Sequence, residues 1–227
     1  MPEWWTYTLG DFLMFAPRTY YRLIERYNGA MWPSHLLAVA LGLAVAVLGL
    51  GSSRARARIA AGVLAVAWVW IGAGFLWQRY GTINWPARWF AVLLGLEALL
   101  LATVGALLGT IALGRRSTRA PVLGLVLLVL GVVVYPLLAP ASGRGWSRAE
   151  VFGLMPDPTA VATLGWLFLQ DGIGARGLQI VPALWCVYSG LTLVALGDAF
   201  AALPLISAAA AAAFAVRAAL ARHRSVA

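Results

Sequence analysis

The stretch RYGTINWPARWFAVLLGLEALLL, residues 79–101, decides the fold class. It enters an apolar run through Trp85-Pro86, and from Trp89 onward its only charged side chain is Glu97. About 20 apolar residues are enough to cross the hydrocarbon of a bilayer as an α-helix, because each residue advances the helix by about 1.5 Å. The stretch therefore predicts a membrane-spanning helix that carries a carboxylate inside the membrane.

The composition of the whole chain points the same way. Of its 227 residues, 62% are hydrophobic and 11% are charged, and the mean hydropathy is +0.84. Soluble domains are about half apolar and about a quarter charged, so this composition is typical of a membrane helix bundle. The 17 basic residues are all arginine, against 8 acidic residues. Because the arginines lie between apolar segments, we interpret them as topology signals and expect a lipid bilayer, not nucleic acid, as the partner.

Apolar runs recur along the chain, and they predict an all-α, polytopic transmembrane helix bundle in residues 32–227. The long runs are residues 32–50, 59–77, 89–113, 121–138, 178–196 and 200–220. A seventh run, residues 159–169, is short, although Asp157 as N-cap and Pro158 at the first helical position suit a helix start. This run can cross the membrane only if residues 151–156 form part of the crossing segment or if the helix lies deep in the protein. Otherwise the segment is re-entrant.

Arginine clusters orient these runs. They follow the first and third runs and close the chain: Arg54, Arg56, Arg58, Arg115, Arg116, Arg119, Arg217, Arg222 and Arg224. The positive-inside rule places these regions in the cytoplasm, with the N-terminus outside and the C-terminus inside. That orientation requires an odd number of crossings, so we predict about seven spans. Six spans and a re-entrant segment at 159–169 are the alternative.

Residues 1–31 precede the first span and form a different unit. Within them, residues 11–28 predict an amphipathic helix that lies in the outer membrane interface. Its charged side holds Arg18, Arg22, Glu25 and Arg26, and its other side holds Tyr20, Leu23, Ile24 and Tyr27. The alternative is a helix that caps the outer mouth of the bundle.

A repeat relates two parts of the chain. Its copies are residues 26–49 and 79–102, and each contains Arg-Tyr followed four residues later by Trp-Pro. Both copies enter the membrane from the same predicted side, so the repeat is parallel.

The third run also carries small residues at steps of three and four: Ala91, Gly95, Ala98, Ala102, Gly105 and Gly109. Small residues let helix backbones approach closely, so this seam is expected to pack against another helix.

Glu97 points about 120° away from that seam. An acidic residue that faced lipid at mid-depth would cost about 2.5–3.5 kcal/mol, so the helix is expected to be covered on this side as well. Three roles stay open for Glu97: it handles protons or cations, it is a neutral acid bonded to a neighbouring helix, or it contacts a partner subunit.

A second polar group lies on the predicted outer side. His35 is expected to form an interfacial hydrogen bond, and its functional alternative is an outer vestibule that attracts anions. The residues of that vestibule would be His35 with Arg26, Arg79, Arg88, Trp32 and Trp85. Asp171 and Asp198 lie at segment ends, where we expect solvated helix caps.

No catalytic residues, metal site or cofactor are predicted. Haem ligation by two histidines needs a second histidine at depth, and Tyr188-Ser189-Gly190 lacks a histidine partner for serine-protease chemistry. The single cysteine, Cys186, lies in an apolar run, which excludes a disulfide framework.

The run EWWTYTLGDFLMFAPRTYYRLIERYN (residues 3–28), the WP that follows it, and PDPTAVATLGWLFL (residues 156–169) resemble the DUF6064 family of bacterial multi-pass membrane proteins. The resemblance covers the whole chain. It implies a polytopic protein of a bacterial inner membrane and no activity. From the residues, two functions stay open. One is a small transporter or channel for a small solute or ion that uses Glu97. The other is a non-catalytic membrane subunit that scaffolds a larger complex. A stoichiometric partner among other membrane subunits would favour this second function, whereas a homo-oligomer of the chain alone would favour transport.

Overall fold

The computed structural model describes residues 8–51, 53–111, 120–170 and 173–224, and these contain helices and no strand. The all-α prediction is therefore confirmed. The helices are α1 (Pro17–Met31), α2 (Ser34–Leu50), α3 (Arg54–Trp70), α4 (Ala87–Leu100), α5 (Ala120–Val129), α6 (Tyr135–Ala141), α7 (Pro156–Phe168), α8 (Ile173–Gly177), α9 (Ile180–Ala195) and α10 (Ala202–Arg224). Short 3₁₀ helices are η2 (Leu9–Phe12), η4 (Tyr80–Thr82) and η7 (Trp146–Arg148). The π-helical turns η3 (Ile71–Trp77), η5 (Leu101–Leu107) and η6 (Leu130–Val134) continue α3, α4 and α5.

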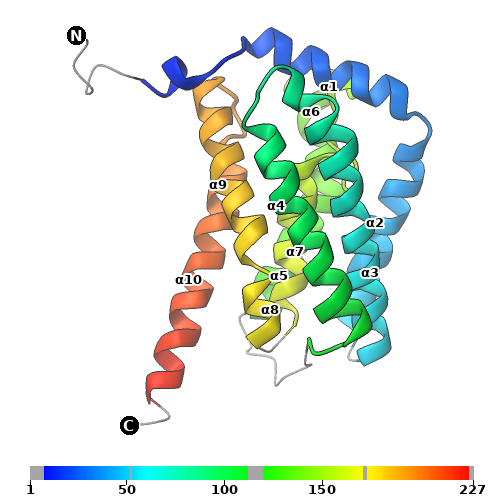
Figure 1. Ribbon diagram of the computed structural model, residues 1–227, viewed down its shortest axis with the longest axis vertical. Coiled ribbons are helices and arrows are strands. Elements are labelled where there is room, and N and C mark those ends of the chain that lie inside the picture. Colours follow the sequence, from blue (N-terminus) through cyan, green and yellow to red (C-terminus); the bar gives the residue numbers. More distant parts are fainter. Residues whose placement is uncertain (1–7, 52, 112–119, 171–172, 225–227) are drawn as a thin grey trace.

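Helix α1 lies across one end of the bundle, while the longer helices run along it (Figure 1). The chain bends by 93° between α1 and α2. The apolar face of α1 is buried through Tyr20, Ile24 and Tyr27. At its end, the Asn28 amide donates hydrogen bonds to the carbonyl oxygens of residues 147 and 149, at 2.9 and 2.8 Å, which attaches α1 to η7. The bundle therefore has an α1 end and an opposite end, toward which α10 runs (Figure 1).

Helix α7 forms the centre of the bundle. All 13 of its residues are buried, and it contacts α2, α3, α5, η6, α9 and α10. Glycines allow this close approach: a Cβ on Gly165 would lie 2.6 Å from the Leu128 nitrogen, and one on Gly131 would lie 2.5 Å from the Pro158 oxygen. Residues 159–169 therefore lie deep in the protein, which is one of the two conditions under which so short a helix can cross.

Within the residues that the structure describes, four helices are long and apolar enough to cross a membrane. They are Arg54–Thr82, Ala87–Leu107, Pro121–Ala141 and Gly174–Ala195. The bent pair of α1 and α2 would add a fifth span, whereas α7 and the apolar part of α10, Ala202–Arg217, are shorter. These helices fit a membrane protein, and the count of seven crossings stays a prediction.

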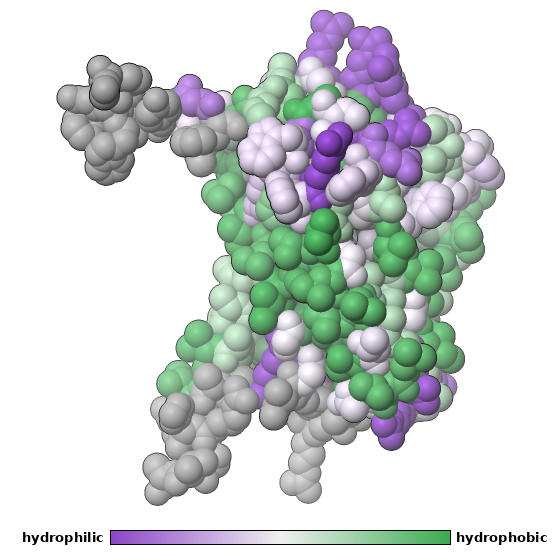
Figure 2. Space-filling view, in the orientation of Figure 1, coloured by the Kyte–Doolittle hydropathy of each residue, from purple (hydrophilic) through white to green (hydrophobic). Residues whose placement is uncertain are grey.

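The surface and the core agree with that setting. Large apolar side chains, such as Leu37, Val66 and Val92, are exposed along the helices. They form a green zone between hydrophilic residues at the α1 end and further hydrophilic residues at the opposite end (Figure 2). Buried aromatic side chains fill the interior, where the Trp68 indole donates to the Thr163 hydroxyl of α7 at 3.2 Å.

The third predicted span ends before residue 113. Turn η5 stops at Leu107, and Gly109 has a φ of 59°, a left-handed conformation that favours glycine. The free carbonyl groups at this end accept hydrogen bonds from two arginines of α3. Arg54 Nε donates to the Gly109 oxygen at 2.9 Å, and Arg58 Nε donates to the Ala106 oxygen at 2.6 Å. Gly109 therefore lies beyond the helix, outside a packing seam.

The rest of the small-residue seam divides between two environments. Ala91, Ala98 and Gly105 are buried, and a Cβ on Gly105 would lie 2.6 Å from the Ala61 Cβ of α3. Gly95 is exposed, and a Cβ there would meet nothing within 4 Å. Ala102 is partly buried. Gly95 thus departs from the expected packing, because it lines a groove together with Ala102 and does not meet another helix.

Candidate functional site

A cluster of charged and hydroxyl groups lies inside the α1 end of the bundle. We call it the polar cluster, and its members are Tyr21, Tyr135, Arg144, Glu150, Asp157 and Asp198. They come from α1, from α6, from the segments on either side of η7, from the start of α7 and from the turn between α9 and α10. The cluster is therefore built by folding and has no counterpart in a local sequence motif.

Asp157 attaches the central helix to α9. Its side chain is 1% exposed. The Trp185 indole donates to Oδ1 at 2.7 Å, and the Ser189 hydroxyl donates to Oδ2 at 2.6 Å. The sequence expectation of an N-cap is wrong: α7 begins at Pro156, and Met155 occupies the N-cap position. Asp157 instead lies in the first turn of α7, where the positive end of the helix dipole stabilises a negative charge.

Asp198 is the second buried acid of the cluster. Its side chain is 5% exposed, forms an ion pair with Arg144, and accepts a hydrogen bond from the Tyr21 hydroxyl at 2.5 Å. Its Oδ1 also accepts a hydrogen bond from the Phe200 backbone N–H at 2.8 Å, within the turn between α9 and α10. The expectation of a solvated cap is therefore wrong, because α1 and the turn after α6 cover this carboxylate. Asp171 lies outside the described residues.

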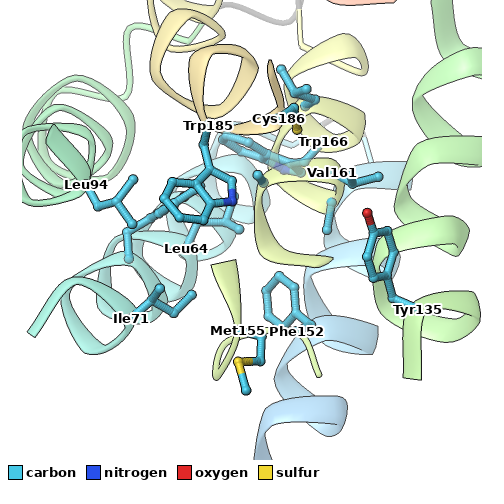
Figure 3. Packing of buried hydrophobic residues seen from close by; sticks show 14 of the residues in the cluster. Leu64, Ile71, Leu94, Tyr135, Phe152, Met155, Val161, Trp166, Trp185 and Cys186 are labelled. Atoms are coloured by element: carbon cyan, nitrogen blue, oxygen red, sulfur yellow. The ribbon is translucent and has the colours of Figure 1, made fainter. Parts of the chain in front are cut away.

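Glu150 and Tyr135 line a small cavity in the cluster. Its volume is about 20 Å³, which is room for about one water molecule. Tyr135 is 4% exposed and points from α6 into the bundle (Figure 3). Its hydroxyl has no hydrogen-bond partner within the described part of the chain. Burial raises the pKa of the Glu150 carboxyl well above its usual range, the charge of Asp157 raises it further, and Arg144 lowers it.

Glu97 lies deeper in the bundle, on α4. It is 0% exposed, so the chain itself covers the carboxyl group. Neither carboxylate oxygen has a hydrogen-bond partner among the residues that the structure describes. Two turns earlier on α4, and on nearly the same face, Phe90 packs edge-on against Trp185 at 5.4 Å between ring centroids. Glu97 therefore lies further from the α1 end than the contact between Phe90 and Trp185, whose indole donates to Asp157.

The proposed vestibule residues are distributed over several places. His35 lies at the corner between α1 and α2, where its Nε2 is 3.2 Å from the Asn28 amide oxygen. Arg26 and Arg79 line one groove together. The remaining three do not line that groove: the Arg88 guanidinium lies 5.8 Å from the Trp77 ring centroid, and Trp32 and Trp85 are exposed.

The sequence reasoning missed most of the polar cluster. Asp157 and Asp198 were visible in the sequence but resembled ordinary cap residues, and Arg144 and Glu150 lie in a connecting segment with no motif. In residues 8–51, 53–111, 120–170 and 173–224, no group of three or more His, Cys, Asp or Glu side chains is placed to hold a metal ion. The carboxyl, hydroxyl and guanidinium groups of the cluster can form hydrogen bonds, and its carboxyl groups can bind protons.

Comparison with known proteins adds the family and nothing beyond it. No curated protein and no solved structure matches the chain. A family model matches residues 18–224, nearly the whole chain, and its description is "Family of unknown function (DUF6064)". The resemblance noted in the sequence is confirmed, and the chain belongs to the DUF6064 family.

Proposed function

We propose that this protein is a multi-pass protein of a bacterial inner membrane that transports protons or small cations through its buried carboxyl groups. In this proposal, Glu97 is the site at mid-depth, and the polar cluster is the site of entry at the α1 end. The α1 end faces outward, and the opposite end, which holds Arg54, Arg56 and Arg58, faces the cytoplasm.

The observation that carries the proposal is the state of Glu97. A buried polar group without a hydrogen bond costs about 1–3 kcal/mol, and buried acids with a purely structural role are normally bonded. Both carboxylate oxygens of Glu97 lack a partner among the described residues, although the group is fully buried within a candidate span. An ionisable group inside a candidate membrane span is by default a functional hypothesis, so in this proposal Glu97 binds a proton or a cation reversibly.

The polar cluster supplies the groups that would load this site. A proton binds at Glu150, whose raised pKa favours the protonated form, next to a cavity that has room for a water molecule. Asp157 lies beside Glu150 at the top of α7 and contacts Trp185. From the level of Phe90, Glu97 is seven residues further along α4, about 10 Å along the helix axis. The carboxyl groups thus form a series that leads from the α1 end into the bundle.

Proton flux into proteoliposomes under a membrane potential tests the proposal. Wild-type protein should conduct, and Glu97→Gln should abolish flux, because glutamine keeps the shape of the side chain but cannot titrate. Glu25→Gln is the matched control: it removes one carboxylate at the exposed ion pair with Arg148 and should leave flux unchanged. Flux that persists in Glu97→Gln, or no flux in the wild type, would overturn the transport function.

A second function, a non-catalytic subunit of a larger membrane complex, is favoured by a different observation. An apolar groove of about 550 Å³ lies between α2 and α3, with Leu37, Leu41 and Val63 among its lining residues. A helix of a partner subunit would fill such a groove. Native mass spectrometry of the protein extracted from its own membrane tests this function, which requires a stoichiometric partner. A lone chain, or copies of this chain alone, would contradict it.

A further inference from the structure

Two grooves on the surface meet at Gln78 and Arg79. The first groove, of about 650 Å³, runs between α3–η3 and α4 and is lined almost wholly by apolar side chains. The second, of about 470 Å³, lies between α1 and the η3–η4 turn. Its lining includes Arg18, Arg22, Arg26 and Arg79. Because Gln78 and Arg79 line both, we treat the pair as one α3–α4 groove with an apolar length and an arginine end.

Small residues hollow out the apolar length. A Cβ on Gly95 would meet no atom within 4 Å, and one on Gly74 would meet none closer than 3.8 Å. Ala98 and Ala102 continue this floor. From Ala65 to Gln78, at the end of η3, the groove follows 14 residues, which is roughly 20 Å along the helix axis. One leaflet of a bilayer has a hydrocarbon depth of about 15 Å, so the groove is long enough for an acyl chain.

The described lining of the arginine end contains four arginines and no acidic residue. Arg18, Arg22 and Arg26 follow one another at steps of four along α1, a spacing at which like charges repel. The nearby acid, Glu25, forms an ion pair with Arg148 instead, at 3.1 Å. Among the residues for which the structure gives positions, none of the four groove arginines forms an ion pair, and no acidic residue lines the groove.

We propose that the α3–α4 groove binds one anionic phospholipid. The phosphate lies among Arg22, Arg26 and Arg79, and one acyl chain lies along the groove floor past Gly95. Basic pockets beside membrane helices recognise anionic head groups in this way. A soluble anion would leave the apolar length empty, and a zwitterionic lipid would leave the arginine charges uncompensated. The site is independent of the buried carboxyl groups and of the transport function.

Native mass spectrometry in neutral detergent tests this site with three probes: phosphatidylglycerol, phosphatidylcholine and glycerol phosphate. Phosphatidylglycerol should bind best, and Arg26→Gln/Arg79→Gln should weaken it roughly 30-fold, because each arginine near a membrane surface strengthens binding of anionic lipid about fivefold. Arg88→Gln/Arg217→Gln is the matched control. It removes the same charge outside the groove and should leave the affinity unchanged.

Gly95→Leu tests the acyl-chain half of the site separately. The open space around its Cβ accommodates leucine, so the variant should stay folded while it displaces the acyl chain and weakens lipid binding. Equal retention of phosphatidylcholine and phosphatidylglycerol would overturn the proposal, as would equal loss of affinity in the two arginine pairs. Competition by glycerol phosphate with no effect of Gly95→Leu would also overturn it, in favour of a site for soluble anions.

Discussion

Replacing Asp157 with alanine removes the contact that attaches the central helix to α9. The wild-type carboxylate accepts hydrogen bonds from the Trp185 indole at 2.7 Å and the Ser189 hydroxyl at 2.6 Å, in a position that is 1% exposed. A hydrogen bond to a charged group contributes about 1.5–3 kcal/mol. Loss of both bonds should therefore lower the free energy of unfolding by about 3–6 kcal/mol, a large part of the 5–15 kcal/mol typical of a folded domain.

Asp157→Asn separates these hydrogen bonds from the other effects of the substitution. The amide oxygen still accepts from Trp185, and the amide nitrogen donates to Ser189, whose hydroxyl accepts as readily as it donates. The asparagine variant should therefore lose only about 1 kcal/mol. Ser189→Ala, which removes one bond, should lie between the two.

Thermal unfolding in detergent measures all three variants. For a chain of this size, 1 kcal/mol corresponds to about 2–4 °C, so the alanine variant should unfold roughly 6–24 °C below the wild type. An alanine variant that unfolds within about 2 °C of the asparagine variant would refute the argument, since the two hydrogen bonds would then contribute nothing.

Two further predictions concern packing and pH. Gly105→Leu should destabilise the bundle strongly in thermal unfolding, because its Cβ would lie 2.6 Å from the Ala61 Cβ, whereas Gly95→Leu should be tolerated; equal stabilities would show that α3 does not pack on η5. Glu150→Gln should unfold at a higher temperature than the wild type at pH 7–8. The raised pKa means that ionisation above the ordinary value of 4.5 favours the unfolded state, and this penalty grows as the pH rises toward the folded pKa. Below about pH 4 the carboxyl is protonated in both states, so the difference should vanish there; a constant difference across the pH range would contradict the role of burial.

The local parts of the fold were predictable from short stretches of sequence. Hydropathy alone indicates helices that fit a membrane, and residues 79–101 contain the larger part of one of them, Ala87–Leu107. Trp-Pro marks helix starts because proline at that place loses no helical hydrogen bond, and α2 and α4 begin directly after Pro33 and Pro86. The buried side of α1 was likewise visible, because its polar and apolar faces differ in character.

The candidate sites depended on contacts between segments far apart in the chain. Asp157 and Ser189 are 32 residues apart, and Tyr21 and Asp198 are 177 residues apart, so no local pattern connects them. Each acid alone resembled a helix cap.

Sequence patterns also did not show which side of each membrane-like helix packs against protein and which side is exposed. In water, an apolar stripe identifies the buried face of a helix, but in a bilayer both lipid and protein interior are apolar, so hydropathy does not distinguish them. Gly95 and Gly105 therefore looked equivalent in the sequence, although one lines a groove and the other packs against Ala61. The sequence by itself determined that the chain forms apolar helices and where several of them begin. Only the tertiary structure decided which faces meet, because that depends on the distance between neighbouring backbones.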